Sequence, residues 1–159
     1  MKKIISLLLF TPLLFACSND KPYTGKKIGL GYVENGSLVN SSVSQMKQIA
    51  FDYRIDSIFY IGDDDCAACV KLKQDISGWC KTNHANVYYI HYSEITESDL
   101  STLISITADD YYKWDENSTI PATYFMMGGA ILFRGSSDNT LKYLNRYVEV
   151  VASTSSIDQ

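Results

Sequence analysis

Two cysteines separated by two residues, Cys66 and Cys69, place the strongest constraint on how this chain can fold. A continuous apolar run over residues 55–61 precedes them, ends at Gly62 and is typical of a strand buried on both faces of a sheet. Beyond the motif, apolar residues recur at helical spacing as far as Trp79. The cysteine pair is therefore predicted to lie at the junction between a buried strand and the first turn of a helix.

A helix N-terminus would make this pair reactive, because its free N–H groups and partial positive charge stabilise a thiolate. Cys66 is then expected to be the exposed nucleophile, and Cys69, one turn later, the thiol that resolves a mixed disulfide. The aspartates at positions 63–65 oppose this effect, since negative charge close to a thiol disfavours its ionisation. Each aspartate is alternatively a candidate cap of the helix.

The N-terminus predicts a targeting segment over residues 1–16. Lys2 and Lys3 precede an apolar stretch that is too short to span a bilayer. The stretch ends at Cys17 in a pattern that resembles the bacterial lipobox, which implies cleavage before Cys17 and lipid attachment to it. An ordinary secretory signal with a chance cysteine is the alternative. Either interpretation places the folded part outside the cytoplasm, and the first predicts a membrane-anchored bacterial lipoprotein.

The rest of the chain is expected to form a tether over residues 17–27, one domain over residues 28–152 and a frayed tail over residues 153–159. A length of 159 residues suits a single domain with a core of its own. The net charge is −4 and there is no run of Lys and Arg, which argues against a nucleic-acid partner. A monomer is expected.

Hydrophobic periodicity predicts strands and helices that alternate and then end in a hairpin and a last helix. Strands are expected over residues 27–33, 55–61 and 87–91, and helices over residues 41–52, 66–80 and 99–108. Gly128 and Gly129 indicate a hairpin between residues 122–127 and 130–134. The last helix is expected over residues 137–151, with Ser136 or Ser137 as its N-cap. Their inward residues are expected to be Leu100, Leu103, Ile104 and Thr107 in one helix and Leu141, Leu144, Val148 and Val151 in the other. This order predicts an α/β fold in which helices flank both faces of a central mixed β-sheet.

Three features together resemble the thioredoxin superfamily over about residues 51–151: the Cys66-Ala67-Ala68-Cys69 motif after a buried strand, Ile120–Pro121 ahead of the hairpin, and the hairpin followed by a C-terminal helix. The resemblance implies a thioredoxin-like fold with a terminal β-hairpin and a C-terminal helix. It also implies a cis peptide bond before Pro121 and backbone pairing of Ile120 with an extended substrate near Cys66.

A shorter match narrows the resemblance. Tyr60-Ile61-Gly62 before the motif and Lys71 after it look most like the bacteriocin transport accessory group, which are extracytoplasmic thiol–disulfide oxidoreductase-like lipoproteins. Two positions depart from the thioredoxin pattern, which usually has a buried acidic residue where this chain has Tyr60 and a tryptophan where it has Asp65. In thioredoxins the acidic residue assists proton transfer to the resolving thiol, so whether this chain uses general-base catalysis is left open. The sequence also leaves open whether the pair oxidises or reduces its substrates.

The sequence therefore predicts an enzyme that carries out thiol–disulfide exchange on extracytoplasmic protein or peptide substrates. Cys66 and Cys69 are its expected catalytic residues, Ile120 and Pro121 its substrate-binding residues, and no cofactor or metal is expected. The alternative is a non-catalytic thioredoxin-fold lipoprotein with a structural Cys66–Cys69 disulfide, which would act as a binding or secretion accessory module.

Other polar residues allow competing interpretations. Cys66, Cys69, Cys80 and His84 resemble a zinc ligand set, but one helix would separate Cys66 from Cys80 by roughly 21 Å. Cys80 is expected to be a small buried hydrophobe, with a third redox thiol as the alternative. His91 is expected to pack or to reach solvent rather than to act in catalysis. The aromatic stretch over residues 111–116 is expected to pack at a helix end or, alternatively, to border the substrate groove.

Overall fold

The computed structural model describes residues 33–108, 110–115 and 117–154. The predicted targeting segment, Cys17 and the tether lie outside these residues, as do most of the strand expected over residues 27–33 and the tail beyond residue 154. Among the residues that are described, no helix has the length and apolar character needed to cross a membrane.

The described residues contain one five-stranded sheet in the order β1-β3-β2-β4-β5. Its strands are β1 (Leu38–Ser41), β2 (Ser57–Gly62), β3 (Val87–His91), β4 (Ala122–Met127) and β5 (Ala130–Gly135). β1, β3 and β2 run parallel, whereas β4 is antiparallel to both β2 and β5. All six residues of β2 are buried, which confirms the prediction of a central strand covered on both faces.

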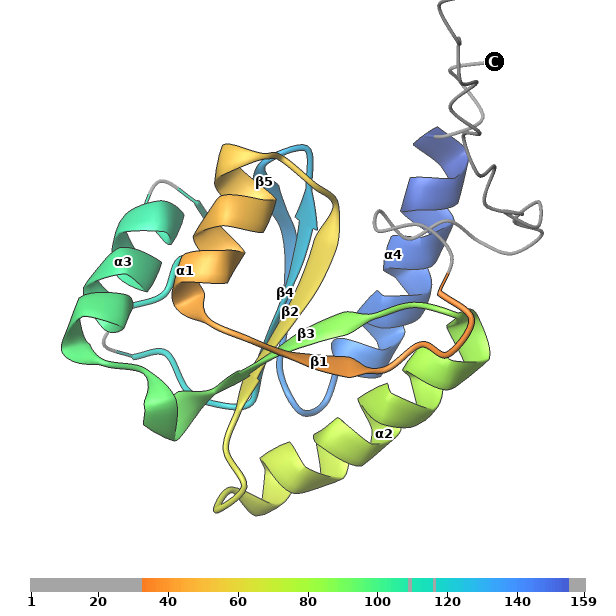
Figure 1. Ribbon diagram of the computed structural model, residues 1–159, viewed down its shortest axis with the longest axis horizontal. Coiled ribbons are helices and arrows are strands. Elements are labelled where there is room, and N and C mark those ends of the chain that lie inside the picture. The colour runs from red at the N-terminus through yellow and green to blue at the C-terminus, as the bar shows by residue number, and fades with distance from the viewer. Residues whose placement is uncertain (1–32, 109, 116, 155–159) are drawn as a thin grey trace, which may run out of the picture.

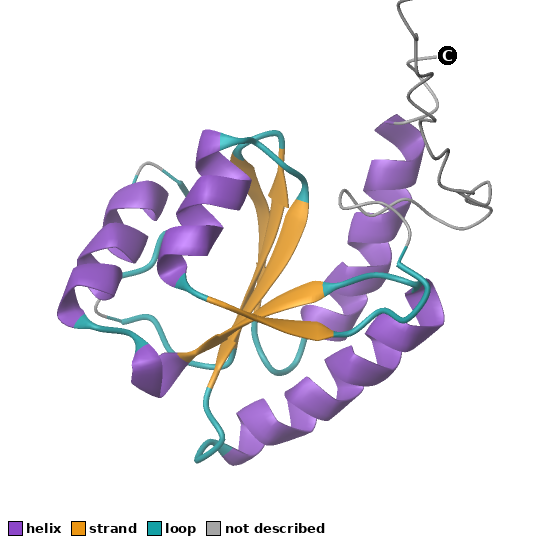
Figure 2. Ribbon diagram, viewed as in Figure 1, coloured by secondary structure: helices purple, strands orange, loops and turns teal. Residues whose placement is uncertain are grey.

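Helices cover both faces of this sheet, as Figures 1 and 2 show. One face carries α2 (Ala67–Asn83) and α4 (Thr140–Thr154), which enclose a core with Ile58, Tyr60 and Phe125. The other face carries α1 (Val43–Met46), a π-helical turn (Lys47–Asp52) and α3 (Glu97–Thr107), which enclose a second core. A short 3-10 helix, Tyr92–Glu94, follows β3. The predicted α/β architecture is therefore confirmed.

The first strand among the described residues, β1, was not predicted from the sequence. β1 is only four residues long and includes the polar Asn40 and Ser41, so it has neither an apolar run nor a clear alternation. A short edge strand needs little apolar sequence, because its pairing with β3 supplies its hydrogen bonds. The following helix begins at Val43, after Ser42 and Gln45 form a reciprocal capping box.

The start of α4 also differs from the prediction. The helix begins at Thr140, so neither Ser136 nor Ser137 stands directly before it, and the Ser136 N–H donates to Asn139 Oδ1 at 2.7 Å. Its inward residues are Thr140, Leu144, Tyr147, Val148 and Val151, at helical spacing, whereas Leu141 is 39% exposed.

The inward side of α3 shows a similar error at Ile104. This side chain is 42% exposed, while Leu103 and Thr107 are buried and Ile106 packs partly against the second core. In both helices the prediction buries an apolar residue, Leu141 or Ile104, that in the structure points outward. An exposed aliphatic residue at the rim of an inward stripe is common in folded proteins, so composition alone does not reveal it.

Candidate functional site

The cysteine motif lies at the junction that the sequence predicts, between β2 and α2. Cys66 is the N-cap of α2, and its Sγ accepts a hydrogen bond from the Cys69 backbone N–H at 3.2 Å. The two cysteines form a disulfide with their Cα atoms 5.1 Å apart. Cys66 is partly exposed, whereas Cys69 is only 1% exposed. A reagent or substrate therefore approaches the pair from the side of Cys66.

The aspartates before the motif do not cap α2, because the Cys66 side chain occupies that position. Asp63 instead stabilises the loop: its Oδ1 accepts from the Asp65 N–H at 3.2 Å and its Oδ2 from the Ser93 N–H at 2.9 Å. This second bond ties the loop before Cys66 to the 3-10 helix after β3. The interpretation of an aspartate as the helix cap is therefore wrong, because α2 begins one residue later than a cap at Asp65 requires and Cys66 is the N-cap.

Tyr60 fills the place where thioredoxins usually have a buried acidic residue. It is fully buried, and its hydroxyl donates to the Cys69 carbonyl at 2.7 Å. Its ring stacks on Tyr89 at 5.4 Å between centroids. Burial raises the pKa of Tyr60 well above its usual range, so the hydroxyl stays protonated. Tyr60 therefore acts as a hydrogen-bond donor that holds the first turn of α2, and it is not a base at neutral pH.

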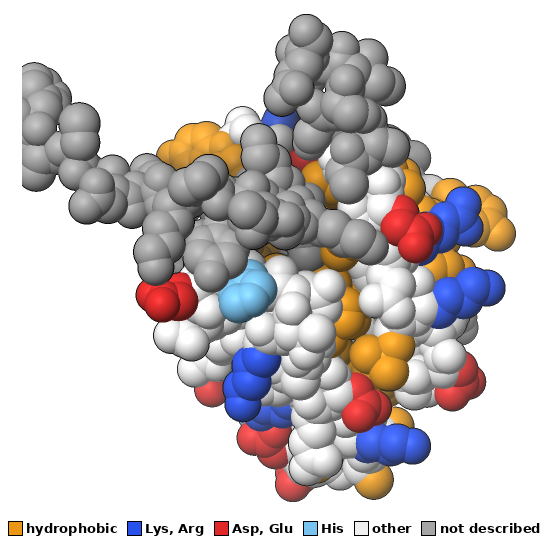
Figure 3. Space-filling model, turned by 90° about the vertical axis from the view of Figure 1, so that its right-hand side faces the viewer, with side chains coloured by type: hydrophobic (Ala, Val, Ile, Leu, Met, Phe, Trp, Pro, Cys, Tyr) orange, Lys and Arg blue, Asp and Glu red, His pale blue; other side chains and the backbone are white. Residues whose placement is uncertain are grey.

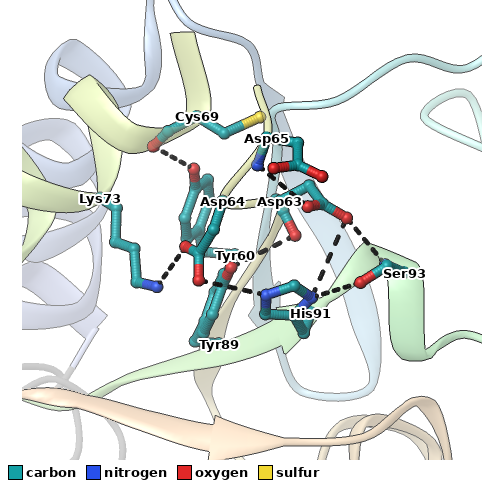
Figure 4. A network of polar contacts seen from close by, with 10 residues as sticks. Tyr60, Asp63, Asp64, Asp65, Cys69, Lys73, Tyr89, His91 and Ser93 are labelled. Atoms are coloured by element: carbon teal, nitrogen blue, oxygen red, sulfur yellow. Dashed lines mark hydrogen bonds and ion pairs between the residues drawn. The ribbon is translucent and has the colours of Figure 1, made fainter. Parts of the chain in front are cut away.

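A charge network surrounds the loop between β2 and the motif (Figure 4). Asp64 accepts a hydrogen bond from Lys73 Nζ at 2.8 Å, and its other oxygen lies 3.3 Å from His91 Nε2. The bond from Lys73 holds the pKa of Asp64 below its usual range, and the bond from the Asp65 backbone N–H does the same for Asp63. Both aspartates are therefore ionised at neutral pH, with Lys73 as the permanent countercharge.

The Ile120–Pro121 peptide bond is cis, as the thioredoxin resemblance implied. β4 begins at the next residue, Ala122, which pairs with Ile61 in β2. This register places Pro121 at the edge of the sheet where β2 ends and the chain turns toward Cys66. Pro121 is buried and Ile120 is partly exposed. The structure therefore brings the residues predicted as catalytic and as substrate-binding to one edge of the sheet.

Sequence reasoning missed the contribution of His91 to this edge. His91 ends β3, and its register partner is Gly62, one residue before Asp63. The sequence contained a signal for this position, because neighbouring parallel strands end at the same edge of a sheet. Pairing the two predicted strands would have placed His91 beside the aspartates. Lys73 was missed for a related reason, since its reach back to Asp64 depends on how the loop folds.

The structure also places Cys80, the proposed zinc ligands and the aromatic residue Trp114. α2 continues without interruption past Cys80, which keeps Cys80 far from Cys66 as the helical spacing predicted. Cys80 is fully buried, and this burial raises the pKa of its thiol to about 11. The described residues contain no cluster of three His, Cys, Asp or Glu side chains that could hold a metal ion. Trp114 is buried and packs beside Tyr124, so at least this aromatic residue has a packing role.

A hollow of about 380 Å³ opens beside the motif, between the first turns of α2 and the start of α4. Its lining residues are Ala68, Lys71, Leu72, Asp75, Ser137, Asp138 and Leu141. Figure 3 looks onto this side of the molecule, where hydrophobic side chains form a seam flanked by charged ones. Ala68, which lies between the two cysteines in the motif, is the lining residue that borders the dithiol in sequence.

Comparison with known proteins relates the fold to thioredoxins. No protein-family model and no curated protein sequence matches the chain. Among solved structures, oxidised thioredoxin O1 from Arabidopsis thaliana matches with a TM-score of 0.51 and 18% identity, covering 74% of this chain and 99% of that one. Oxidised thioredoxin O2 from the same plant matches with a TM-score of 0.50 and 18% identity, covering 77% and 99%. Thioredoxin from Malassezia sympodialis matches with a TM-score of 0.53 and 15% identity, covering 77% and 97%. At these identities the likeness shows the fold, which is thioredoxin-like.

Proposed function

We propose that this protein carries out thiol–disulfide exchange on protein or peptide substrates outside the cytoplasm. One observation carries the proposal: a partly exposed Cys66 caps α2 and is bonded to a buried Cys69. Only the outer sulfur is open to a partner, whereas the inner one is held where it can attack the outer one. This division of roles is what a dithiol needs to form and then release a mixed disulfide.

The reaction follows from this arrangement. In the reduced protein the Cys66 thiolate attacks a substrate disulfide, so that the substrate S–S bond breaks and one substrate sulfur leaves as a thiolate. The Cys69 thiolate then attacks Cys66, which restores the Cys66–Cys69 disulfide and releases the second substrate sulfur. The substrate gains two electrons and two protons, and the protein loses them. The same steps in reverse oxidise a substrate dithiol, and neither direction needs a cofactor.

Substrate binding is assigned to the sheet edge beside the motif. Ile120 is partly exposed and precedes Pro121 at the start of β4, and we assign its backbone the role of pairing with an extended substrate segment. The hollow that Ala68 lines offers room for a substrate side chain on the same side of α2 as this residue of the motif. A polypeptide substrate fits these features better than a small thiol, because it can occupy the edge and the hollow together.

The cellular setting is proposed from the N-terminal sequence. Lipid on Cys17 would anchor a monomeric protein to the outer side of a bacterial membrane, where substrate disulfides form. The short match of Tyr60-Ile61-Gly62 and Lys71 supports a role among bacteriocin transport accessory proteins. The net charge of −4 and the lack of a run of Lys and Arg in the sequence argue against a nucleic-acid partner.

Tyr60 supports a second candidate function. No carboxylate stands where thioredoxins use one to move the proton of the resolving thiol, and the Tyr60 hydroxyl is committed to the Cys69 carbonyl. If this makes exchange too slow, the disulfide is structural and the protein is a binding or secretion accessory module.

Trapping of the mixed disulfide separates the two candidates. In cells, Cys69→Ser leaves Cys66 without its resolving partner, so covalent adducts that disappear on reduction are expected on non-reducing gels. The Cys66→Ser/Cys69→Ser double variant is the matched control and should carry none. Insulin reduction by the wild-type chain gives the second measurement. Absence of adducts together with absence of turnover would leave only the structural disulfide.

A further inference from the structure

We infer that His91 is a positioning residue for the dithiol. In its protonated form it offsets the negative charge of Asp63 and Asp64, and this raises the fraction of Cys66 present as thiolate in acidic solution. The inference rests on the proposed thiol–disulfide exchange and adds its electrostatic control. His91 contacts neither sulfur in the described contacts, so it acts through the loop before Cys66.

The geometry connects one imidazole to both carboxylates. His91 Nε2 lies 3.3 Å from Asp64 Oδ2, and Nδ1 lies 3.9 Å from Asp63 Oδ2. Ser93 Oγ is 2.8 Å from Nδ1, and the ring edge faces Tyr89 at 5.6 Å between centroids. The imidazole is 24% exposed, so it is held in place and yet in contact with water. A proton on His91 therefore adds positive charge beside Asp63 and Asp64, which lie three and two residues before Cys66 in the chain.

The ionisable groups around the imidazole are mostly acidic or neutral. They are Asp63 and Asp64 from the loop, Tyr89 from β3, Glu94 from the 3-10 helix and Asp99 from α3. Lys73 on α2 contributes a permanent charge at Asp64, 2.8 Å away. Lys73 faces a run of three aspartates before Cys66. His91 differs from Lys73 because an imidazole can be either charged or neutral, so its contribution to the charge of this loop is not permanent.

The direction of the effect follows from the charges. Asp63 and Asp64 hold their charge into acidic solution, since hydrogen bonds lower the pKa of each. When His91 is protonated it offsets one of these charges, so the Cys66 thiolate is less disfavoured. When His91 is neutral, Lys73 is the contacting countercharge of Asp64 and the aspartates act more strongly on Cys66. A protonated His91 would thus increase the thiolate fraction of Cys66 relative to a variant that lacks the imidazole.

The test measures the thiolate directly, without a substrate. The full chain carrying Cys69→Ser is reduced, and alkylation of Cys66 by iodoacetamide is followed by peptide mass spectrometry, which separates Cys66 from Cys17 and Cys80. His91→Gln keeps a polar side chain but cannot become charged. We expect it to slow Cys66 alkylation about two- to fivefold in acidic solution, where the imidazole is charged, and to leave it unchanged in alkaline solution, where the imidazole is neutral.

Two controls identify the cause. His84→Asn removes the other histidine at the far end of α2, where a left-handed φ of 52° suits asparagine, and should show no pH-dependent difference. Asp64→Asn should accelerate alkylation and cancel most of the His91→Gln effect in the double variant. It also keeps the inference testable if His91→Gln unfolds the protein, which circular dichroism would show.

The outcomes are distinct. A His91→Gln effect of equal size at every pH would mean a merely structural role and would overturn the inference, as would no effect at any pH or an equal effect from His84→Asn. None of these results concerns adduct formation by Cys69→Ser, so exchange can stand without the inference. Conversely, a confirmed pH-dependent effect with neither adducts in cells nor insulin turnover would refute the proposed exchange and leave the electrostatic coupling intact.

Discussion

Replacing Tyr60 by phenylalanine removes one buried hydroxyl and leaves the ring and its stack on Tyr89 in place. The lost contact is the 2.7 Å hydrogen bond to the Cys69 carbonyl. That carbonyl lies within α2 and keeps its helical N–H partner, so it is not left without a donor. The expected loss is the net value of one buried hydrogen bond, about 0.5–1.5 kcal/mol of unfolding free energy. For a domain of this size each 1 kcal/mol corresponds to about 3–5 °C in Tm, so the expected decrease is about 2–7 °C.

The pH dependence of this loss tests the role assigned to Tyr60. Burial raises its pKa, so the folded state keeps the proton while an unfolded tyrosine loses its proton above about pH 10. The native tyrosine therefore costs stability only as pH rises beyond that value, and below about pH 9 the difference between wild type and Tyr60→Phe should be constant.

Urea unfolding of the oxidised full chain, followed by circular dichroism at several pH values, measures this difference. Tyr111→Phe, at a side chain that is 91% exposed, is the matched control and should change stability by less than about 0.5 kcal/mol. Insulin reduction by Tyr60→Phe should stay within a few-fold of wild type. A stability difference that varies between about pH 5 and 9, or loss of turnover with the fold intact, would refute a purely structural donor and show that the hydroxyl moves a proton.

Two further predictions concern the packing around the motif. An added Cβ at Gly62 would lie 2.6 Å from the Tyr60 hydroxyl, so Gly62→Ala should lower the unfolding free energy by about 1–3 kcal/mol in urea titrations. The helical Gly78 has open space around its Cβ position, and Gly78→Ala should instead stabilise the protein by about 0.5–1 kcal/mol; equal effects at both sites would contradict the contact with Tyr60. Cys80→Ala should cost about 1 kcal/mol because Cys80 is fully buried, and should leave insulin reduction unchanged. A lower turnover with the fold intact would show a third redox thiol.

The sequence predicts best those elements whose burial is complete or one-sided. β2 contains the apolar run Ile58–Ile61 and α2 has a regular apolar stripe, so both were placed to within a few residues. β1 was not predicted, because an edge strand of four residues, half of them polar, shows neither an apolar run nor an alternation of apolar and polar residues. The start of α4 was misplaced because Asn139, rather than either predicted serine, bonds the turn before the helix.

The candidate site divides in the same way. Cys66 and Cys69 follow from a motif, and the position of Pro121 follows from a resemblance, so both could be named without a structure. The contacts of Tyr60 and His91 depend on which strands are neighbours and on their register, and periodicity within one segment does not contain that information. Local patterns therefore located the reactive sulfurs, whereas the groups that control them required the tertiary structure.

The uncharged Tyr60 behind the motif leaves the charges of this site to the loop before Cys66. A neutral hydroxyl in the core avoids the cost of burying a carboxylate and fixes the Cys69 carbonyl, but it supplies no charge that responds to pH. The charged and ionisable groups of this site instead lie at the adjacent sheet edge, and they include Asp63, Asp64, Lys73 and the partly buried His91. Solvent screens such groups, so their influence on Cys66 is smaller than that of a buried acid and more sensitive to salt. If the dithiol exchanges with substrates, its pH dependence should therefore follow the loop before Cys66 rather than the core behind Cys69.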